Sequence, residues 1–129
     1  MQTIELTHPY QKECILQESI VLALGFFDGI HLGHQEVITT AKKVAQERGF
    51  KVAVMSFNQH PSVIFQNVDP ESIQYVSPLE RKKELLEELG VDIFYLVDFT
   101  KEFGALSPQE FVDQYIVDLN AKVIVAGFD

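Results

Sequence analysis

The sequence predicts an α/β fold, an open parallel sheet with helices on both of its faces. Short aliphatic runs of strand length alternate along the chain with longer segments whose apolar residues recur at helical spacing. This alternation is typical of parallel strands joined by right-handed crossovers. The chain has 129 residues, 47% of them hydrophobic, which suffices for one core and is too few residues for two ordinary domains.

The first half of the chain supplies three expected strands and one helix. Residues 1–6 alternate enough to form an edge strand, whereas the aliphatic run Ile20–Leu24 suits a strand buried on both faces. Residues 33–48 have the apolar spacing of one helix face, and Gly49 follows where a left-handed C-cap is expected. The valine-rich run Lys51–Phe57 is the next buried strand.

Two helices in the second half share the same start signal. Residues 77–80 (SPLE) and 107–110 (SPQE) each place a serine at the N-cap, a proline at the first helical position and a glutamate three residues after the serine. The first helix is expected to end before Gly90, and strands are expected at 91–97 and 122–126. The second helix is expected to face the core with Phe111, Val112, Tyr115, Ile116 and Leu119.

Composition restricts the classes of partner. The net charge of −9 disfavours a nucleic acid, and Lys42-Lys43 and residues 81–83 (RKK) are interpreted as solvated helix faces. A single cysteine, Cys14, is consistent with a reducing cytoplasm. Because no signal peptide is recognisable and the longest apolar runs are only strand-sized, we expect no membrane association and a cytoplasmic protein.

The most informative stretch is 25–34 (GFFDGIHLGH), which links the strand Ile20–Leu24 to the first helix. His31 and His34 are three residues apart at the start of that helix, beside its unpaired amides and the positive end of its dipole. Such a helix start binds phosphate, and two imidazoles add hydrogen-bond donors. A lone histidine there is more often a capping or surface residue, but the pair after a glycine turn favours a nucleotide site.

Other polar residues follow the ends of the remaining predicted strands. In open parallel sheets ligands bind at the carboxyl ends of the strands, so these residues are expected near the two histidines. Asp28 is equally suited to bracing its own turn, and Asp98 is more simply a turn cap. The residues expected at this edge, besides those of 25–34, are Asn58, His60, Asp98, Gly127 and Asp129.

Four segments resemble one family. Residues 25–34 are similar to the GxFDGxHxGH signature of the HxGH nucleotidyltransferases, most closely the FMN adenylyltransferase module of bacterial FAD synthetases. Residues 57–61 (FNQHP) resemble that family's FxPHP element, with Gln59 in place of the usual proline. Residues 89–92 (LGVD) resemble its LGVD, and 125–129 (VAGFD) the start of its VGxDFxFG.

The resemblance implies a Rossmann-like HxGH nucleotidyltransferase fold and transfer of AMP from ATP to FMN, which yields FAD and pyrophosphate. The expected ligands are ATP with Mg²⁺, and FMN and FAD as substrate and product; no residue is assigned to a metal. The implied catalytic residues are His31 and His34. The implied ATP-binding residues are Gly25, Phe26, Phe27, Asp28, Gly29, His31, Gly33 and His34, and the implied flavin-binding residues are Asn58, His60, Pro61 and Asp129.

The resemblance also sets the expected domain organisation. Residues 1–129 are expected to form one FMN adenylyltransferase domain that is incomplete at its C-terminus and has no riboflavin kinase domain. A missing strand would leave a sheet edge exposed, which favours a homo-oligomer. The long aperiodic stretch 58–76 is expected to form a lid over the ligand.

Two alternatives remain open from the sequence. The first is another HxGH transferase, of the glycerol-phosphate cytidylyltransferase or pantetheine-phosphate adenylyltransferase type, which would share the first motif but not FNQHP. The second is a non-catalytic flavin- or nucleotide-binding module that uses the same pocket. The preferred acceptor distinguishes another HxGH transferase from an FMN adenylyltransferase. Release of pyrophosphate distinguishes an enzyme from a non-catalytic binding module.

Overall fold

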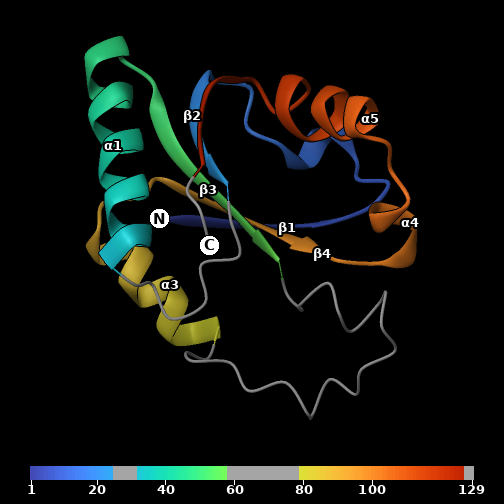
Figure 1. Cartoon of the computed structure of the whole chain (residues 1–129), viewed down its shortest axis with the longest axis horizontal. Helices are drawn as coiled ribbons and strands as arrows, with labels where there is room; N and C mark the ends of the chain where they lie inside the picture. The colour runs from blue at the N-terminus through green and yellow to red at the C-terminus, as the bar shows by residue number, and fades with distance from the viewer. Residues whose placement is uncertain (25–31, 58–78, 127–129) are drawn as a thin grey trace.

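The expected α/β architecture is confirmed by the computed structural model, which describes residues 1–24, 32–57 and 79–126, with the side chains of 32–34 and 79–80 left out. Five parallel strands form one sheet in the order β1-β4-β3-β2-β5 (Figure 1). The strands are β1 (Gln2–Thr7), β2 (Ile20–Leu24), β3 (Lys51–Phe57), β4 (Ile93–Asp98) and β5 (Ala121–Ala126).

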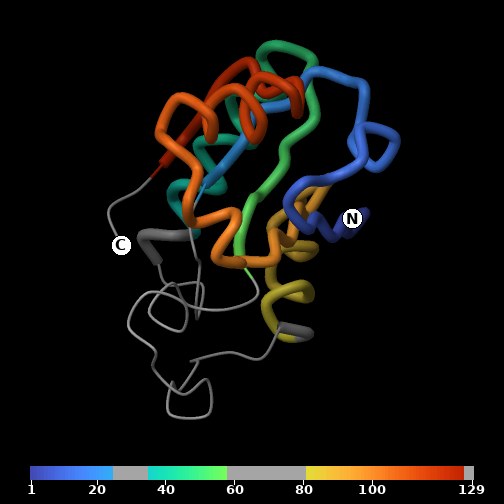
Figure 2. The backbone as a smooth tube through the Cα atoms, turned by 90° about the vertical axis from the view of Figure 1, so that its right-hand side faces the viewer, coloured from blue at the N-terminus to red at the C-terminus, as the bar shows by residue number. Residues whose placement is uncertain are grey.

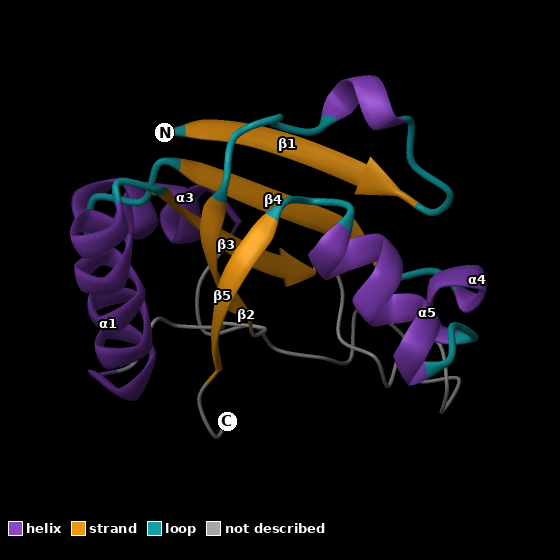
Figure 3. Cartoon of the chain, turned by 90° about the horizontal axis from the view of Figure 1, so that it is seen from above, coloured by secondary structure: helices purple, strands orange, loops and turns teal. Residues whose placement is uncertain are grey.

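Helices cover both faces of the sheet (Figure 3). The helix α1 (Leu32–Arg48) follows β2, and α3 (Leu79–Glu88) precedes β4. The remaining helical elements are η1 (Lys12–Cys14), α4 (Lys101–Gly104), α5 (Pro108–Val112) and the π-helical turn η3 (Asp113–Val117). The helices α1 and α3 lie on one side of the sheet, and α4 and α5 lie on the other (Figures 1 and 3).

The alternation of side chains along β3 divides the core into two layers. Val52 and Val54 pack on the side of α1 and α3 with mostly aliphatic neighbours such as Ile38 and Leu86. Ala53 and Met55 pack on the opposite side, in a layer that also contains the rings of α4, α5 and η3. Every residue from Val52 to Ser56 is buried, as expected for a central strand covered on both faces.

Several local signals act as expected. Gly49 and Gly90 have positive φ angles of 71° and 88°, so each ends its helix in the left-handed conformation that glycine adopts without strain. At the start of α5, the Ser107 side chain accepts from the Glu110 amide and the Glu110 side chain from the Ser107 amide, which is the predicted capping box. Ser77 and Pro78 of the corresponding box lie outside the described residues, as do the side chain of Glu80 and the expected lid at 58–76.

The second predicted helix differs from a regular one. It begins at Pro108, but its last five residues form the π-helical turn η3, whose wider winding shifts the inward face. Tyr115, within this turn, is fully buried, whereas Val112, just before it, is 40% exposed. The expected inward placement was therefore wrong for Val112. The short helix α4, capped by Thr100, was not predicted.

Candidate functional site

The carboxyl ends of three neighbouring strands define the candidate site. In the sheet β2 lies between β3 and β5, and Leu24 pairs with both Met55 and Ala126 near the ends of those strands. Figure 2 shows the three strands running toward the same end of the molecule. The last described residues of these strands, Leu24, Phe57 and Ala126, therefore lie at one edge of the sheet. This adjacency, expected from the alternation of strands and helices alone, is the geometric basis of the site.

The start of α1 lies at the same edge, because this helix follows β2. It begins at Leu32, one residue before the expected start, so Gly33 and His34 belong to its first turn. With 17 residues, α1 places the positive end of a helix dipole at this edge. The side chain of His34 is not among those described.

Most of the predicted site residues lie outside the described part of the chain, so their roles stay predictions. The structure describes the strands that lead into these residues and the helix that follows them. The residues concerned are Gly25, Phe26, Phe27, Asp28, Gly29, His31, Asn58, His60, Pro61, Gly127 and Asp129.

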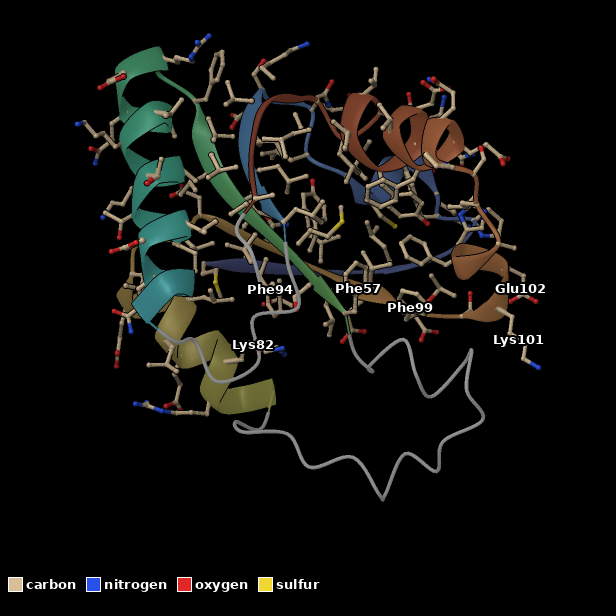
Figure 4. The ribbon with its side chains drawn as sticks, viewed as in Figure 1. Phe57, Lys82, Phe94, Phe99, Lys101 and Glu102 are labelled. Carbon is tan, nitrogen blue, oxygen red and sulfur yellow. The ribbon has the colours of Figure 1, made fainter. Side chains whose placement is uncertain are left out.

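An aromatic cluster reaches this edge on the α4 and α5 side. Phe57, the last residue of β3, has its ring centroid 5.5 Å from that of Phe99 and 5.7 Å from that of Phe103. Phe103 continues the cluster to Tyr115, with the centroids 4.9 Å apart and the rings nearly perpendicular. Because Phe57 directly precedes Asn58, aromatic side chains lie where the predicted flavin-binding segment begins (Figure 4).

On the α1 and α3 side two buried polar side chains lie at this edge. Ser56 is fully buried, and Lys82, in the first turn of α3, is only 4% exposed. The Lys82 ammonium donates to the Ser56 hydroxyl, with the nitrogen and oxygen 3.4 Å apart. The interpretation of residues 81–83 as a solvated face was therefore wrong for Lys82. The available signal was its spacing of four residues from Leu86, which puts both side chains on the inward face of α3.

A group of tyrosines on the far side of the aromatic cluster was also missed. The Tyr115 hydroxyl lies 2.9 Å from His8 Nδ1, and the Tyr10 hydroxyl donates to the Gln114 carbonyl. Burial raises the pKa of Tyr10 to about 12, and the negative charge of Asp118 adds to the shift. Burial likewise raises the pKa of Tyr115. These hydroxyls stay protonated at neutral pH and fasten η3 to the loop after β1.

The segment 89–92 (LGVD) has a structural role at the opposite edge of the sheet. Gly90 ends α3, and Asp92 accepts from the Val52 amide through Oδ2 at 3.0 Å. The Asp92 carbonyl accepts from the Gln2 amide at 2.9 Å, and its own amide donates to the Val52 carbonyl at 3.0 Å. Asp92 thus joins the amino ends of β1, β3 and β4, away from the candidate site.

The described residues show neither a metal centre nor a membrane segment. Within 1–24, 32–57 and 79–126, no three His, Cys, Asp or Glu side chains come together in a way that could hold a metal ion. Among the helices in these ranges, none has the length and apolarity needed to cross a membrane.

The comparisons with known proteins agree with one another on most of the chain. The family model described as FAD synthetase matches residues 14–129. The chain is 50% identical over 129 residues to the bifunctional riboflavin kinase/FMN adenylyltransferase of Listeria monocytogenes, covering all of this chain and 41% of that protein. It is 48% identical over 129 residues to the enzyme of the same name from Bacillus subtilis, covering 40% of it.

A solved structure has the same fold. A chain from Streptococcus pneumoniae, described as a macrolide-efflux protein, superposes with a TM-score of 0.87 and 35% sequence identity, over 100% of this chain and 49% of that one. The chain spans about two fifths of the length of the curated relatives it matches. With a family model that accounts for residues 14–129 and a relative at 50% identity, the chain belongs to the FAD synthetase family.

Proposed function

We propose that this chain is an adenylyltransferase domain that transfers AMP from ATP to FMN, giving FAD and pyrophosphate. The observation that carries the proposal is the adjacency of the ends of β2, β3 and β5 to the start of α1, in a chain that belongs to the FAD synthetase family. The residues expected to bind ATP and flavin all follow these strand ends in the sequence or lie in the first turn of α1. A cytoplasmic location, supported by the single cysteine, is part of the proposal.

The proposed reaction needs no general base. A phosphate oxygen of FMN, already an anion, attacks the α-phosphorus of ATP, and the bond from that phosphorus to the bridging oxygen breaks as pyrophosphate leaves. His31 and His34 donate hydrogen bonds to the triphosphate oxygens, whose charge increases in the transition state, and the α1 amides assist them. Catalysis therefore consists of positioning and electrostatic stabilisation.

The two substrates would occupy different parts of the edge. The triphosphate lies at the start of α1 against Gly25 to His34, and Asn58, His60, Pro61 and Asp129 face the flavin. The aromatic cluster that ends at Phe57 supports a flat aromatic ligand beside Asn58. Mg²⁺ accompanies ATP and is held largely by phosphates and water, where it offsets their negative charge.

The direct test is FAD formation from FMN and ATP, with pyrophosphate release as a second readout. His31→Ala and His34→Ala should each weaken transition-state stabilisation by about 2 to 4 kcal/mol, as expected for an oxyanion donor. His8→Ala is the matched control, because His8 follows β1, three strand positions from β2. Wild-type rates in both histidine variants would refute the assigned roles.

Alternative activities are separated in the same assay. Replacing FMN by glycerol phosphate or pantetheine phosphate, and ATP by CTP, tests the other transferase types. FMN binding without pyrophosphate release would identify a binding module and not an enzyme.

A further inference from the structure

We propose that the outer face of α5 and η3 is a docking surface for a protein segment that presents apolar side chains beside lysine or arginine. The surface, which we call the valine ridge, consists of Val112 and Val117 and of the aspartates that follow them, Asp113 and Asp118. It lies on the opposite side of the sheet from α1 (Figure 3). The inference goes beyond the proposed function, because none of these residues is expected to bind ATP or flavin.

The exposure of the two valines is the first argument. Val112 is 40% exposed and Val117 is 59% exposed, and the described residues expose one other large hydrophobic side chain, that of Ile124 in β5. Tyr115 and Ile116, from the same turn, are buried in the core layer that contains the aromatic rings. The helix therefore already has an inward face, and the two valines lie outside it.

The π-helical turn brings the two valines into one stripe, which is the second argument. In a π-helix the amide of residue i+5 bonds to the carbonyl of residue i, so residues five apart lie one above the other. The Asp118 amide donates to the Asp113 carbonyl at 3.0 Å in this pattern. Val112 and Val117 have the same spacing, whereas a regular α-helix would separate them by roughly 140° around its axis. Turns of this kind are rare and occur frequently at functional sites, which makes the stripe a candidate interface.

The charge beside the valines selects the partner, which is the third argument. Asp113 and Asp118 are exposed and form an acidic stripe next to the apolar one. Asp113 accepts a hydrogen bond from the uncharged Gln109 side chain at 2.9 Å. Within the described ranges the ion pairs join other residues, so no lysine or arginine there neutralises either aspartate. An apolar stripe beside carboxylates complements an apolar stripe beside lysine or arginine.

The same charges disfavour other occupants of the ridge. A nucleic acid or an anionic membrane would be repelled by the two aspartates and by the net charge of −9. A second copy of this chain carries the same acidic stripe, so a symmetric contact of ridge against ridge would bring like charges together. A basic amphipathic helix avoids this repulsion and can lay its apolar face along the two valines.

The test uses a synthetic helical peptide with leucines on one face and lysines on both sides of them. A second peptide has glutamates in place of the lysines. Binding is measured by titration calorimetry, and the contact surface is mapped from amide chemical shifts in NMR spectra of the labelled chain. The lysine peptide should bind and shift amides of α5 and η3, whereas the glutamate peptide should not bind.

The apolar contribution is tested by substitution to threonine. Val112→Thr and Val117→Thr keep the β-branched shape and remove one methyl group each. Each should weaken binding of the lysine peptide about fourfold, the size expected for one buried methyl group. Ile124→Thr, at the exposed apolar position outside the ridge, is the matched control and should change binding less than about twofold.

The electrostatic contribution is tested by removing two charges at once. Asp113→Asn combined with Asp118→Asn should weaken binding of the lysine peptide about tenfold, and the difference from wild type should shrink in high salt. Glu47→Gln combined with Glu88→Gln makes the same change in net charge at exposed positions of α1 and α3, across the sheet from the ridge. This control should change binding less than about twofold.

Several outcomes would overturn the proposal. Failure of the lysine peptide to bind, or shifts spread over α1 and α3, would show that the ridge is not a docking surface. Equal binding of the two peptides would contradict the charge complementarity. Wild-type dimers in analytical ultracentrifugation that Val117→Thr dissociates would assign the ridge to a second copy of the chain. Unfolding temperatures equal to that of the wild type confirm that the variants are folded, and because the chain is tested without ATP or FMN, these results do not depend on the proposed function.

Discussion

The two faces of the sheet end differently at the carboxyl edge, although one strand contributes to both. On the side of α1 and α3 the layer is mostly aliphatic and ends at Ser56 and Lys82. On the side of α4 and α5 rings continue to the edge, where Phe57 meets Phe99. Ser56 and Phe57 are consecutive residues of β3, so strand alternation alone separates a polar half of the edge from an aromatic half.

This difference supports the proposed transfer of AMP to FMN, which would bring a polyphosphate and a flavin ring to one edge. Polyphosphate needs fixed positive charge and hydrogen-bond donors, whereas a flavin ring needs flat apolar surface. Substitutions that act on one face of the sheet and leave the other intact test this difference.

The largest expected effect is on stability. Phe103, on the aromatic face, and Phe94, on the aliphatic face, are 6% and 0% exposed. Phe103→Ala and Phe94→Ala should each lower the free energy of unfolding by about 3 to 5 kcal/mol, from lost burial and cavity formation. Urea denaturation of the purified variants measures this, and a loss below about 1 kcal/mol would contradict the assigned burial.

Substitution to leucine separates the two faces. Phe103 contacts the rings of Phe57, Phe99, Phe111 and Tyr115, and ring pairs contribute about 0.5 to 1.5 kcal/mol beyond their burial. Phe103→Leu should therefore lower the free energy of unfolding more than Phe94→Leu does, although both substitutions replace phenylalanine by leucine. Equal losses in the free energy of unfolding would mean that burial of apolar area alone stabilises the aromatic face, with no further contribution from the ring pairs.

The next effect is a loss of stability at alkaline pH. The pKa of Tyr10 is raised from 10.0 to about 12, chiefly by burial, and burial raises that of Tyr115 in the same direction. The folded state thus keeps protons that the unfolded state loses above pH 10. The stabilising contribution is complete below that value and is lost as the pH rises toward 12.

Because Tyr10 is partly exposed, we expect its contribution to the free energy of unfolding to fall by only roughly 1 to 2 kcal/mol as the pH rises from 10 to about 12. Tyr10→Phe should flatten the fall in unfolding temperature above pH 10, and tyrosinate absorbance follows the titration directly. A variant as sensitive to alkali as the wild type would show that other groups cause the loss.

Much of the fold was predictable because each signal is local or nearly so. Ile20–Leu24 and Lys51–Phe57 are strands with the expected bounds, since central strands of a parallel sheet are short aliphatic runs. Gly49 and Gly90 marked helix ends because the residue after a helix often has a positive φ, which glycine adopts without strain since it has no Cβ. The grouping of strand ends followed from parallel topology, which places the candidate site before any side chain is considered.

The remaining features depend on contacts between distant residues. The π-helical turn at 113–117 fits Tyr115 against Phe103 and His8, and helical periodicity carries no sign of it. The burial of Lys82 depends on its meeting Ser56, 26 residues earlier in the chain. Charge within a basic run normally predicts exposure, so the burial of Lys82 follows only from the packing of α3 on β3.

The smallest expected effect is at the start of α5, on the aromatic face. The Ser107 hydroxyl accepts from the Glu110 amide at 3.1 Å, so Ser107→Ala should lower the free energy of unfolding by about 1 kcal/mol.

The glutamate of the same capping box adds a pH dependence. Hydrogen bonds from Ser107 lower the pKa of Glu110 below 4.5. The Glu110 carboxylate therefore stabilises the folded state above that pH, and this stabilisation is lost as the pH falls through the lowered pKa. Glu110→Gln should therefore differ from wild type less in acid than at neutral pH, as measured by urea denaturation at both. Thr100→Ala is the matched control, because Thr100 caps α4 on the same face through the Phe103 amide at 3.1 Å without a glutamate partner. If Thr100→Ala shows the same acid dependence relative to wild type as Glu110→Gln, the dependence does not come from the capping box, and the aromatic face owes its pH sensitivity to another carboxylate.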